Sequence, residues 1–177
     1  PTKTMGFGVI YGLTPHGLYN QMAQEGLEDW DERACEKFIK EYYQLRPELG
    51  AWQDQTRAFA GKHGYVTDMF GRLRYIPEML CPVKRYRGAG ERQAINMPIQ
   101  STAQGILKTA MIRMGQEETS FPWFWLLQIH DELMFEVEAP HAPQFVQWAT
   151  DIMESAVKLS VPIKVEAKMG SNWGEMA

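Results

Sequence analysis

Two apolar runs in the last third of the chain, separated by three polar residues, constrain the fold more than any other feature. Residues 123–129 read WFWLLQI and residues 133–137 read LMFEV, with His130, Asp131 and Glu132 between them. Short apolar runs rich in aromatic residues and bounded by a polar cluster indicate strands. We therefore predict two antiparallel strands joined by a tight turn, with a carboxylate exposed at the edge of a sheet.

Most of the remaining chain shows helical spacing of its apolar residues. This spacing predicts helices over residues 3–13, from Pro15 onward, and over 31–45, 47–62, 91–114 and 142–159. Pro98 lies inside the fifth of these and should kink or split it, because proline lacks an N–H and clashes with the preceding turn.

The segments between the helices indicate the rest of the fold. We expect a hairpin over residues 65–77 with its turn near 68–71, a loop over 82–90, and a half-buried strand over 162–168. Together these elements predict an α+β fold, in which a helical portion is followed by a small antiparallel sheet packed by helices.

Composition sets wide limits on function. The 177 residues have the length of one domain, and the net charge of −4 argues mildly against a nucleic-acid partner. The charges are unevenly distributed, however: residues 25–54 carry a net charge of −5 and residues 72–92 a net charge of +4. A local basic stripe can bind a phosphate backbone even in an acidic protein, although a solvated loop would also explain it.

Other classes of protein are disfavoured. The two cysteines, Cys35 and Cys81, lie far apart without a CxxC pattern, so neither a disulfide framework nor a zinc site is indicated. No stretch has the roughly 18 apolar residues of a membrane helix, and no signal pattern is present. Two unpaired cysteines and eleven methionines suit a reducing interior.

The first of three motifs is KTMGFGVIYG, which places Lys3, Phe7 and Tyr11 four residues apart and ends at Gly12. Four residues turn a helix by about 400°, so the three side chains form one gently drifting stripe. A lysine can pair with triphosphate oxygens, and aromatic rings can stack on a base or sugar. Alone, the motif fits the start of an ordinary amphipathic helix better.

The second motif is RQAINMPIQ, with Arg92, Asn96 and Gln100 again four residues apart. The two amides lie one helical turn apart, so both can reach the acceptors that every base pair presents in the minor groove. Such contacts test the shape of a base pair rather than its sequence. Alone, exposed polar helix positions explain this motif better.

The third motif is the QIHDE segment between the two predicted strands. A carboxylate held at a strand turn suits a hard cation such as Mg²⁺, and two such ions about 3.5–4 Å apart can stabilise the attacking and leaving oxygens of phosphoryl transfer. A simple hairpin turn explains the three polar residues at least as well when the motif stands alone.

Taken together, and in this order, the motifs resemble the core of the family A (polymerase I-like) DNA polymerases. KTMGFGVIYG resembles the nucleotide-binding helix of the fingers, and RQAINMPIQSTAQGILKTAMI the long helix that returns to the palm. LLQIHDELMFEV resembles the palm hairpin that carries a catalytic aspartate, and PIKVEAKMGSNW the terminal strand. The resemblance covers essentially the whole chain. It implies a partial fingers subdomain over residues 1–90 and a partial palm subdomain over residues 91–177.

The resemblance implies template-directed DNA synthesis, in which a primer 3′-hydroxyl attacks the α-phosphate of a dNTP and pyrophosphate leaves. Lys3 would contact the triphosphate, Phe7 would stack on the sugar and base, and Tyr11 would lie at the template base. Gly12 would allow close approach. A Phe at the position of Phe7, rather than a Tyr, is associated in the family with stronger discrimination against dideoxynucleotides.

The resemblance also implies the metal and DNA contacts. Asp131 would hold catalytic Mg²⁺, of which the complete enzyme uses two ions, with Glu132 as a supporting ligand and His130 near the primer terminus. The residues expected to contact primer–template DNA are Arg72, Arg74, Arg92, Asn96, Gln100, Gln128 and His130.

Some parts of the family pattern fall outside this sequence. The family's arginine four residues before Lys3, and its other metal-binding aspartate, would both lie before Pro1. We therefore expect the remainder of a polymerase chain as a partner, together with primer–template DNA and dNTPs, and no membrane. We expect the isolated chain to be inactive, and we expect a cytoplasmic location in a bacterial or phage-infected cell.

Three other functions share parts of this sequence pattern. A single-subunit RNA polymerase shares the lysine helix and the His-Asp turn, but Glu132 and the NMPIQ segment favour the DNA enzyme. A non-catalytic module that binds primer–template or nucleotide stays open. A His-Asp metal phosphohydrolase is disfavoured, because the chain has four histidines and His130-Asp131 lies between strands rather than on a helix.

Overall fold

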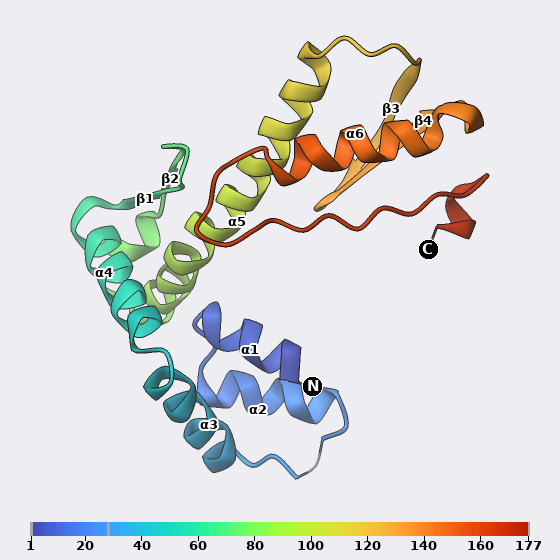
Figure 1. The fold of residues 1–177 in the computed structure, drawn as a ribbon. Helices are drawn as coiled ribbons and strands as arrows, with labels where there is room; N and C mark the ends of the chain where they lie inside the picture. The colour runs from blue at the N-terminus through green and yellow to red at the C-terminus, as the bar shows by residue number, and fades with distance from the viewer. Residues whose placement is uncertain (1, 28, 177) are drawn as a thin grey trace. The chain divides into compact units, whose positions relative to one another are not determined.

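The computed structural model describes residues 2–27 and 29–176, and for residues 2–4 it describes the backbone alone. Helices and two small antiparallel sheets make up the fold, so the predicted α+β class is confirmed (Figure 1). The chain divides into two compact units, Pro1–Ser101 and Thr102–Ala177, and the division falls within one long helix.

Three helices begin the first unit: α1 (Thr2–Ile10), α2 (Pro15–Gln24) and α3 (Glu32–Gln44). Local capping fixes two of their starts. Thr14 accepts a hydrogen bond from the Gly17 N–H at 3.1 Å, and Asp31 accepts one from the Ala34 N–H at 2.7 Å. The helices enclose a small core of Met5, Leu18, Met22 and Cys35.

The rest of the first unit is built on α4 (Pro47–His63) and the start of α5 (Lys84–Gln116). Strands β1 (Tyr65–Thr67) and β2 (Leu73–Tyr75) form the predicted hairpin, and the 3₁₀ helix η1 (Pro77–Leu80) follows. A second core holds these elements together, made of Ala60, Val66, Ile76, Met79, Ala94 and Met97.

The loop predicted over residues 82–90 is wrong, because α5 begins at Lys84. Gly88 and Gly90 signalled a loop, but Gly90 serves packing instead. A Cβ on Gly90 would lie 3.0 Å from the Glu78 Cβ and from the Met79 backbone nitrogen. A glycine is therefore needed where α5 meets η1. Pro98 does not split α5, which runs as one helix from residue 84 to 116.

The second unit pairs a β-hairpin with a helix. Strands β3 (Trp123–Ile129) and β4 (Glu132–Val137) are antiparallel, as predicted, and α6 (Ala142–Glu154) lies across them (Figure 1). The short 3₁₀ helices η2 (Ala139–His141) and η3 (Trp173–Glu175) complete this part. Its buried core consists of Ala110, Met114, Phe121, Phe145, Ala149 and Ile152.

Helix α6 ends at Glu154, earlier than the predicted residue 159. One local hydrogen bond and one tertiary hydrogen bond mark this end. The Ser155 hydroxyl donates to the Asp151 carbonyl at 2.6 Å, and Arg113 Nη1 donates to the Ser155 carbonyl at 2.9 Å. Arg113 thus replaces the backbone N–H that a longer helix would have supplied.

The strand predicted over residues 162–168 is wrong. The segment alternates as expected, with Ile163 and Val165 half-buried and Lys164 exposed, but it pairs with no strand among residues 2–27 and 29–176. Its Val165 N–H instead donates to Glu154 Oε1 at 3.1 Å. In Figure 1 the segment is a red trace without an arrow. Alternation alone does not make a strand, because a strand also needs a hydrogen-bonded neighbour.

Both cysteines are free, with Cys35 buried and Cys81 half-buried. Within the described chain, no helix combines the length and the apolar character that a membrane crossing demands.

Candidate functional site

Helix α1 presents two aromatic rings in parallel. The Phe7 and Tyr11 rings have centroids 6.3 Å apart and planes inclined by 12°, and the Phe7 side chain is 47% exposed. The predicted stripe therefore exists for these two residues. The third member, Lys3, lies in α1, but its side chain falls outside what the structure describes.

Gly12 ends this helix in the left-handed conformation, with φ +75°. A side chain here would be strained by that φ and would also be crowded, since a Cβ would lie 3.2 Å from Ile95 Cδ1. The expectation that Gly12 permits close approach is consistent with this geometry, although the partner observed is α5 of the same unit.

A cavity of about 190 Å³ lies beside Gly12 and brings the first two motifs together within the first unit. Gly12 of the first motif and Arg92 of the second both line it, together with Thr14. Arg57 of α4 also lines it, and the motif analysis missed this residue because it stands between the motifs in an ordinary helical stretch. The complete lining is Gly12, Thr14, Arg57, Gly88, Glu91, Arg92 and Ile95.

The stripe of Arg92, Asn96 and Gln100 runs along α5. Arg92 and Gln100 are exposed, and Asn96 is half-buried. The side-chain oxygen of Asn96 is buried and accepts no hydrogen bond within the described structure. Leaving a buried polar atom unpaired costs about 1–3 kcal/mol, so the side-chain oxygen of Asn96 lowers the stability of the fold.

The β1–β2 hairpin is attached to the neighbouring face of the same helix. Arg74 Nη2 donates to Gln93 Oε1 at 3.0 Å, and the Ser101 hydroxyl donates to Asp68 Oδ2 at 2.5 Å. Gln93, Met97 and Ser101 are four residues apart, so they form the stripe next to Arg92, Asn96 and Gln100. The hairpin thereby places its exposed arginines beside that polar stripe.

Asp68 organises the hairpin turn, and the motif analysis missed it. Its Oδ1 accepts hydrogen bonds from the Phe70 and Arg72 N–H groups, each at 2.9 Å. Burial alone would raise the pKa of the Asp68 carboxyl, but the hydrogen bonds from Ser101, Arg72 and Phe70 outweigh burial and hold the pKa below its ordinary value. The carboxylate is therefore ionised and fixed.

In the second unit, two residues make the turn between β3 and β4. Ile129 pairs with Glu132, so His130 and Asp131 alone form the turn, and both are exposed. His130 has φ +53°, which is unusual for a residue other than glycine and costs on the order of 1 kcal/mol or more. The predicted tight turn with an exposed carboxylate is confirmed.

Two amides fix this turn from outside. Gln104 Nε2 and Gln128 Nε2 each donate to the His130 carbonyl oxygen at 2.8 Å. Gln128 was expected to contact DNA, whereas here its amide supports the turn. No motif predicted a role for Gln104, and the one feature of the sequence that points to it is its position one helical turn after Gln100. Together the two amides hold the backbone of the turn that carries Asp131.

The acidic residues of the turn fit a divalent cation in part. Asp131 offers exposed carboxylate oxygens, the donors that Mg²⁺ prefers, and Glu132 follows as the first residue of β4. Among the described residues, no group of three or more His, Cys, Asp or Glu side chains could hold a metal ion. Mg²⁺ sites often use one or two carboxylates together with substrate phosphates and water, so a partial set is chemically consistent.

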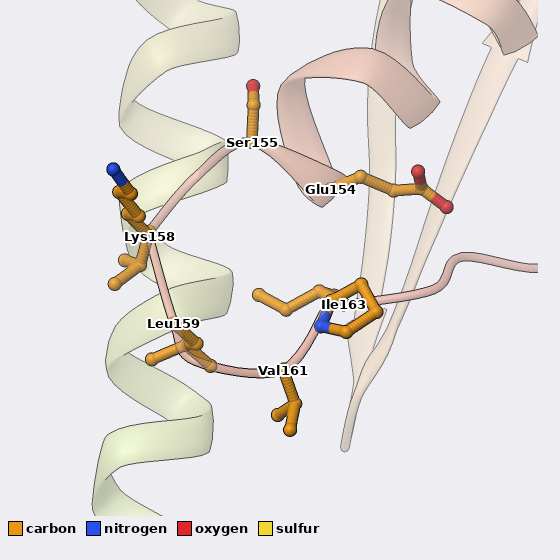
Figure 2. A pocket seen from close by; sticks show the side chains of 8 residues that line it. Glu154, Ser155, Lys158, Leu159, Val161 and Ile163 are labelled. Atoms are coloured by element: carbon orange, nitrogen blue, oxygen red, sulfur yellow. The ribbon is translucent and has the colours of Figure 1, made fainter.

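A second pocket, of about 320 Å³, lies where the chain leaves α6 (Figure 2). It contains none of the predicted site residues. Its carboxylate, Glu154, is already engaged by the Val165 N–H and lies 3.5 Å from Lys164 Nζ. In Figure 2 Lys158 and Glu154 point away from each other, so no charged groups converge in this pocket.

The two units thus carry side chains suited to phosphates, base edges and a divalent cation, which are typical of a protein that handles nucleic acid and nucleotides. Comparison with known proteins agrees. Residues 1–175 match the model of DNA polymerase family A. The chain belongs to this family.

The relatives and a solved structure are consistent with this assignment. The thermostable DNA polymerase I of Thermus thermophilus is 39% identical over 171 residues, and the DNA polymerase I of Deinococcus radiodurans is 37% identical over 171 residues. Each match covers 97% of this chain, which spans about a fifth of the length of these relatives (20% and 17%).

Among solved structures, the POL domain of Pol1 from M. smegmatis, in complex with DNA primer-template and dNTP, matches with a TM-score of 0.89 and 31% identity. The match covers 98% of this chain and 30% of that one.

Proposed function

We propose that this chain forms part of the nucleotidyl-transfer site of a template-directed DNA polymerase, which works in the cytoplasm of a bacterial or phage-infected cell. The observation that carries the proposal is Asp131, an exposed carboxylate at a two-residue turn that two glutamine amides hold in place. Family membership supports it, and so does the likeness to a polymerase solved with primer–template and dNTP.

In this proposal α1 supplies the nucleotide contacts. Lys3 binds the triphosphate, while Phe7 stacks on the sugar and base of the incoming dNTP. Tyr11 lies at the template base, and Gly12 leaves room beside it. The parallel rings of Phe7 and Tyr11 and the left-handed Gly12 support these roles, since flat rings stack on bases without regard to sequence.

The first unit also supplies the duplex contacts. Arg72, Arg74 and Arg92 bind the phosphate backbone, which positions the duplex without reading its sequence. Asn96 and Gln100 bond the minor-groove acceptors that all base pairs share. The exposed arginines and the exposed Gln100 support these assignments. In the second unit, His130 and Gln128 at the β3–β4 turn complete the proposed DNA-binding residues.

For the chemical step we propose Asp131 as ligand of the catalytic Mg²⁺ and Glu132 as a supporting ligand. When bound, divalent cations supply positive charge that offsets the negative charge developing on the reacting oxygens. The protein's own contribution is to fix the Asp131 oxygens at the turn. We propose that the second metal-binding aspartate of the family pattern belongs to a further part of the polymerase chain, so that residues 1–177 alone do not extend a primer.

The alternatives are weaker. The family match and the relatives favour a DNA polymerase over a single-subunit RNA polymerase. A phosphohydrolase centred on His130 and Asp131 lacks a third ligand in the part of the chain that the structure describes. A module that binds primer–template without chemistry is the alternative that an activity assay must address.

The decisive variant is Asp131→Ala in the complete polymerase. We expect primer extension with Mg²⁺ and dNTPs to fall by on the order of 10³-fold or more, because the ligand that holds the cation at the reacting oxygens is lost. Binding of primer–template should change little, since the duplex contacts lie on other residues. Extension is measured on a labelled primer and binding by fluorescence anisotropy.

Glu136→Gln is the matched control, because Glu136 is an exposed carboxylate on β4 away from the turn. This variant should keep full activity. If the complete wild-type polymerase binds primer–template but does not extend it, the result would instead support the non-catalytic module. If the Asp131→Ala variant unfolds, Asp131 is a structural residue.

A second variant separates the nucleotide contact from the duplex contacts. Lys3→Ala should raise the KM for dNTP while leaving the Kd for primer–template nearly unchanged, because its proposed contact is with the triphosphate. Steady-state kinetics with varied dNTP measure this effect. An unchanged dNTP dependence would reject the role given to Lys3.

A further inference from the structure

Backbone hydrogen bonds close the C-terminal end of α1, but they do not use the carbonyl of Ile10. The Leu13 N–H donates to the Gly8 carbonyl at 2.8 Å, and the Gly12 N–H donates to the Val9 carbonyl at 3.0 Å. This is the pair of bonds that a Schellman motif makes around a left-handed glycine. The carbonyl of Ile10, the last helical residue, needs another donor.

That donor is the side chain of Gln53, which lies on α4 and is only 1% exposed. Its Nε2 donates to the Ile10 carbonyl at 2.9 Å and to the Val9 carbonyl at 3.3 Å. Its Oε1 accepts from the Tyr43 hydroxyl at 2.7 Å and from Arg57 Nη2 at 3.4 Å. Both ends of this buried amide are therefore bonded.

Tyr43 of α3 ties the same helix end to a third element. Its hydroxyl lies 3.3 Å from the Val9 carbonyl as well as 2.7 Å from Gln53 Oε1. Burial raises the pKa of the Tyr43 phenol, so the hydroxyl stays protonated and can donate at neutral pH. Val9 itself is fully buried, which makes these donors the replacement for water at this helix end.

We infer that Gln53 and Tyr43 are positioning residues for α1, and that they fix where Tyr11 and Gly12 stand relative to α4. An apolar residue at this buried position of α4 would leave the Ile10 carbonyl without the donor that Gln53 supplies. The polar side chain is therefore explained by the two carbonyls it binds. This inference rests on the proposed function, because it assigns the positioned helix to dNTP binding.

The two residues act as one unit rather than as separate contacts, because the Tyr43 hydroxyl donates to Gln53 Oε1 at 2.7 Å while Gln53 Nε2 donates to the carbonyls of Val9 and Ile10. The unit also reaches the cavity beside Gly12, since Arg57 contacts Gln53 and lines that cavity. A shift of the α1 end should therefore affect nucleotide use more than duplex binding.

The test uses Gln53→Met and Tyr43→Phe in the complete polymerase, which remove the polar groups and keep the volumes. We expect each variant to raise the KM for dNTP on the order of tenfold, with the Kd for primer–template changed far less. The double variant should be no worse than Gln53→Met alone, because both changes break one network.

Matched controls are available on the same helices. Gln55→Met makes the same chemical change at an exposed position of α4, and Tyr42→Phe removes a hydroxyl from the neighbouring tyrosine of α3. Both should leave the KM unchanged. A readout that does not depend on activity is amide hydrogen exchange at Gly12 and Leu13, which should quicken by on the order of tenfold in Gln53→Met.

Two outcomes would overturn the inference. The first is a lowered melting temperature with the KM for dNTP and the exchange rates unchanged, because that result makes Gln53 and Tyr43 merely structural. The second is a double variant whose effect on the KM for dNTP equals the sum of the two single effects in free energy, because that result makes the two residues independent. A wild-type polymerase without primer extension would reject the proposed function instead, and the exchange measurement would then still decide whether the two residues hold α1.

Discussion

At the scale of single residues, the most informative side chains are polar groups in places where apolar ones are usual. Asp68 is 7% exposed and accepts three hydrogen bonds, whereas the oxygen of Asn96 is buried and accepts none. The first arrangement stabilises the fold and the second costs stability. The two residues therefore lead to opposite predictions.

Asp68→Asn should lower the free energy of unfolding by about 1–3 kcal/mol at neutral pH. Both carboxylate oxygens of Asp68 accept hydrogen bonds, whereas the NH₂ group of an asparagine can only donate, so at least one of the three bonds is lost. The folded pKa of Asp68 lies below its unfolded value of about 3.9, so its contribution is present above that value and is lost as the pH falls through the folded pKa. The difference between wild type and variant should shrink below about pH 4.

Urea unfolding at pH 7 and at decreasing pH measures this effect. Asp29→Asn is the control, since Asp29 is exposed, and it should show no such difference. A difference between wild type and Asp68→Asn that stays constant down to acidic pH would contradict the role of the ionised carboxylate.

Asn96→Leu should give the reverse result. Removing the unpaired buried oxygen should leave stability unchanged or raise it by about 1 kcal/mol, while the affinity for primer–template falls. Thermal unfolding and anisotropy measure the two quantities on the same variant. A loss of stability together with unchanged DNA binding would show that Asn96 is a structural residue.

At the scale of elements, α5 and the hairpin beside it define the proposed duplex surface. Arg74 and Asp68 attach the hairpin to α5 through Gln93 and Ser101. The first turns of α5 lie against η1, and residues Glu78 and Met79 of η1 leave no room for a side chain at position 90. Pro82, Gly88 and Gly90 predicted a loop at this place, but the chain is helical from Lys84 and Gly90 packs against η1.

This packing makes a glycine substitution predictable. Gly90→Ala should destabilise the protein by about 1–3 kcal/mol, because its Cβ would lie 3.0 Å from the Met79 backbone nitrogen, which cannot move aside easily. Gly115→Ala, near the other end of α5, meets no atom within 4 Å and should stabilise by up to about 1 kcal/mol. Chemical denaturation of both variants compares them directly.

At the scale of the whole molecule, the acidic average conceals a basic region. All six bases between residues 72 and 92 are exposed, on the hairpin and on the first turns of α5. They belong to one compact unit, whereas the acid-rich residues 25–54 lie on other helices of that unit. Binding of DNA should therefore depend on a few local charges rather than on the net charge of −4.

Salt dependence tests this expectation. Arg72→Gln should weaken primer–template binding for all sequences alike and reduce the slope of log K against log salt by about 0.9, as expected for one lost phosphate contact. Arg33→Gln, in the acid-rich region, removes the same charge and should leave the slope unchanged. Equal effects of the two variants would mean that net charge, and not the basic region, governs binding.

The sequence by itself determined the features that depend on neighbouring residues. Thr14 and Asp31 cap their helices through residues three positions away, and Gly12 ends α1 because glycine adopts a left-handed φ without a steric penalty. The two-residue turn at His130 and Asp131 also follows from local pattern. Three motifs in the right order were sufficient to indicate the family.

The tertiary structure alone decided the features whose partners are distant in the chain. Residues 84–90 are helical and place Gly90 against η1, and residues 162–168 are not a strand because no described strand pairs with them. Gln53 bonds carbonyls 43 and 44 residues away, and Asp68 bonds a hydroxyl 33 residues away. Burial and hydrogen bonding across such separations depend on packing, which periodicity and propensity do not record.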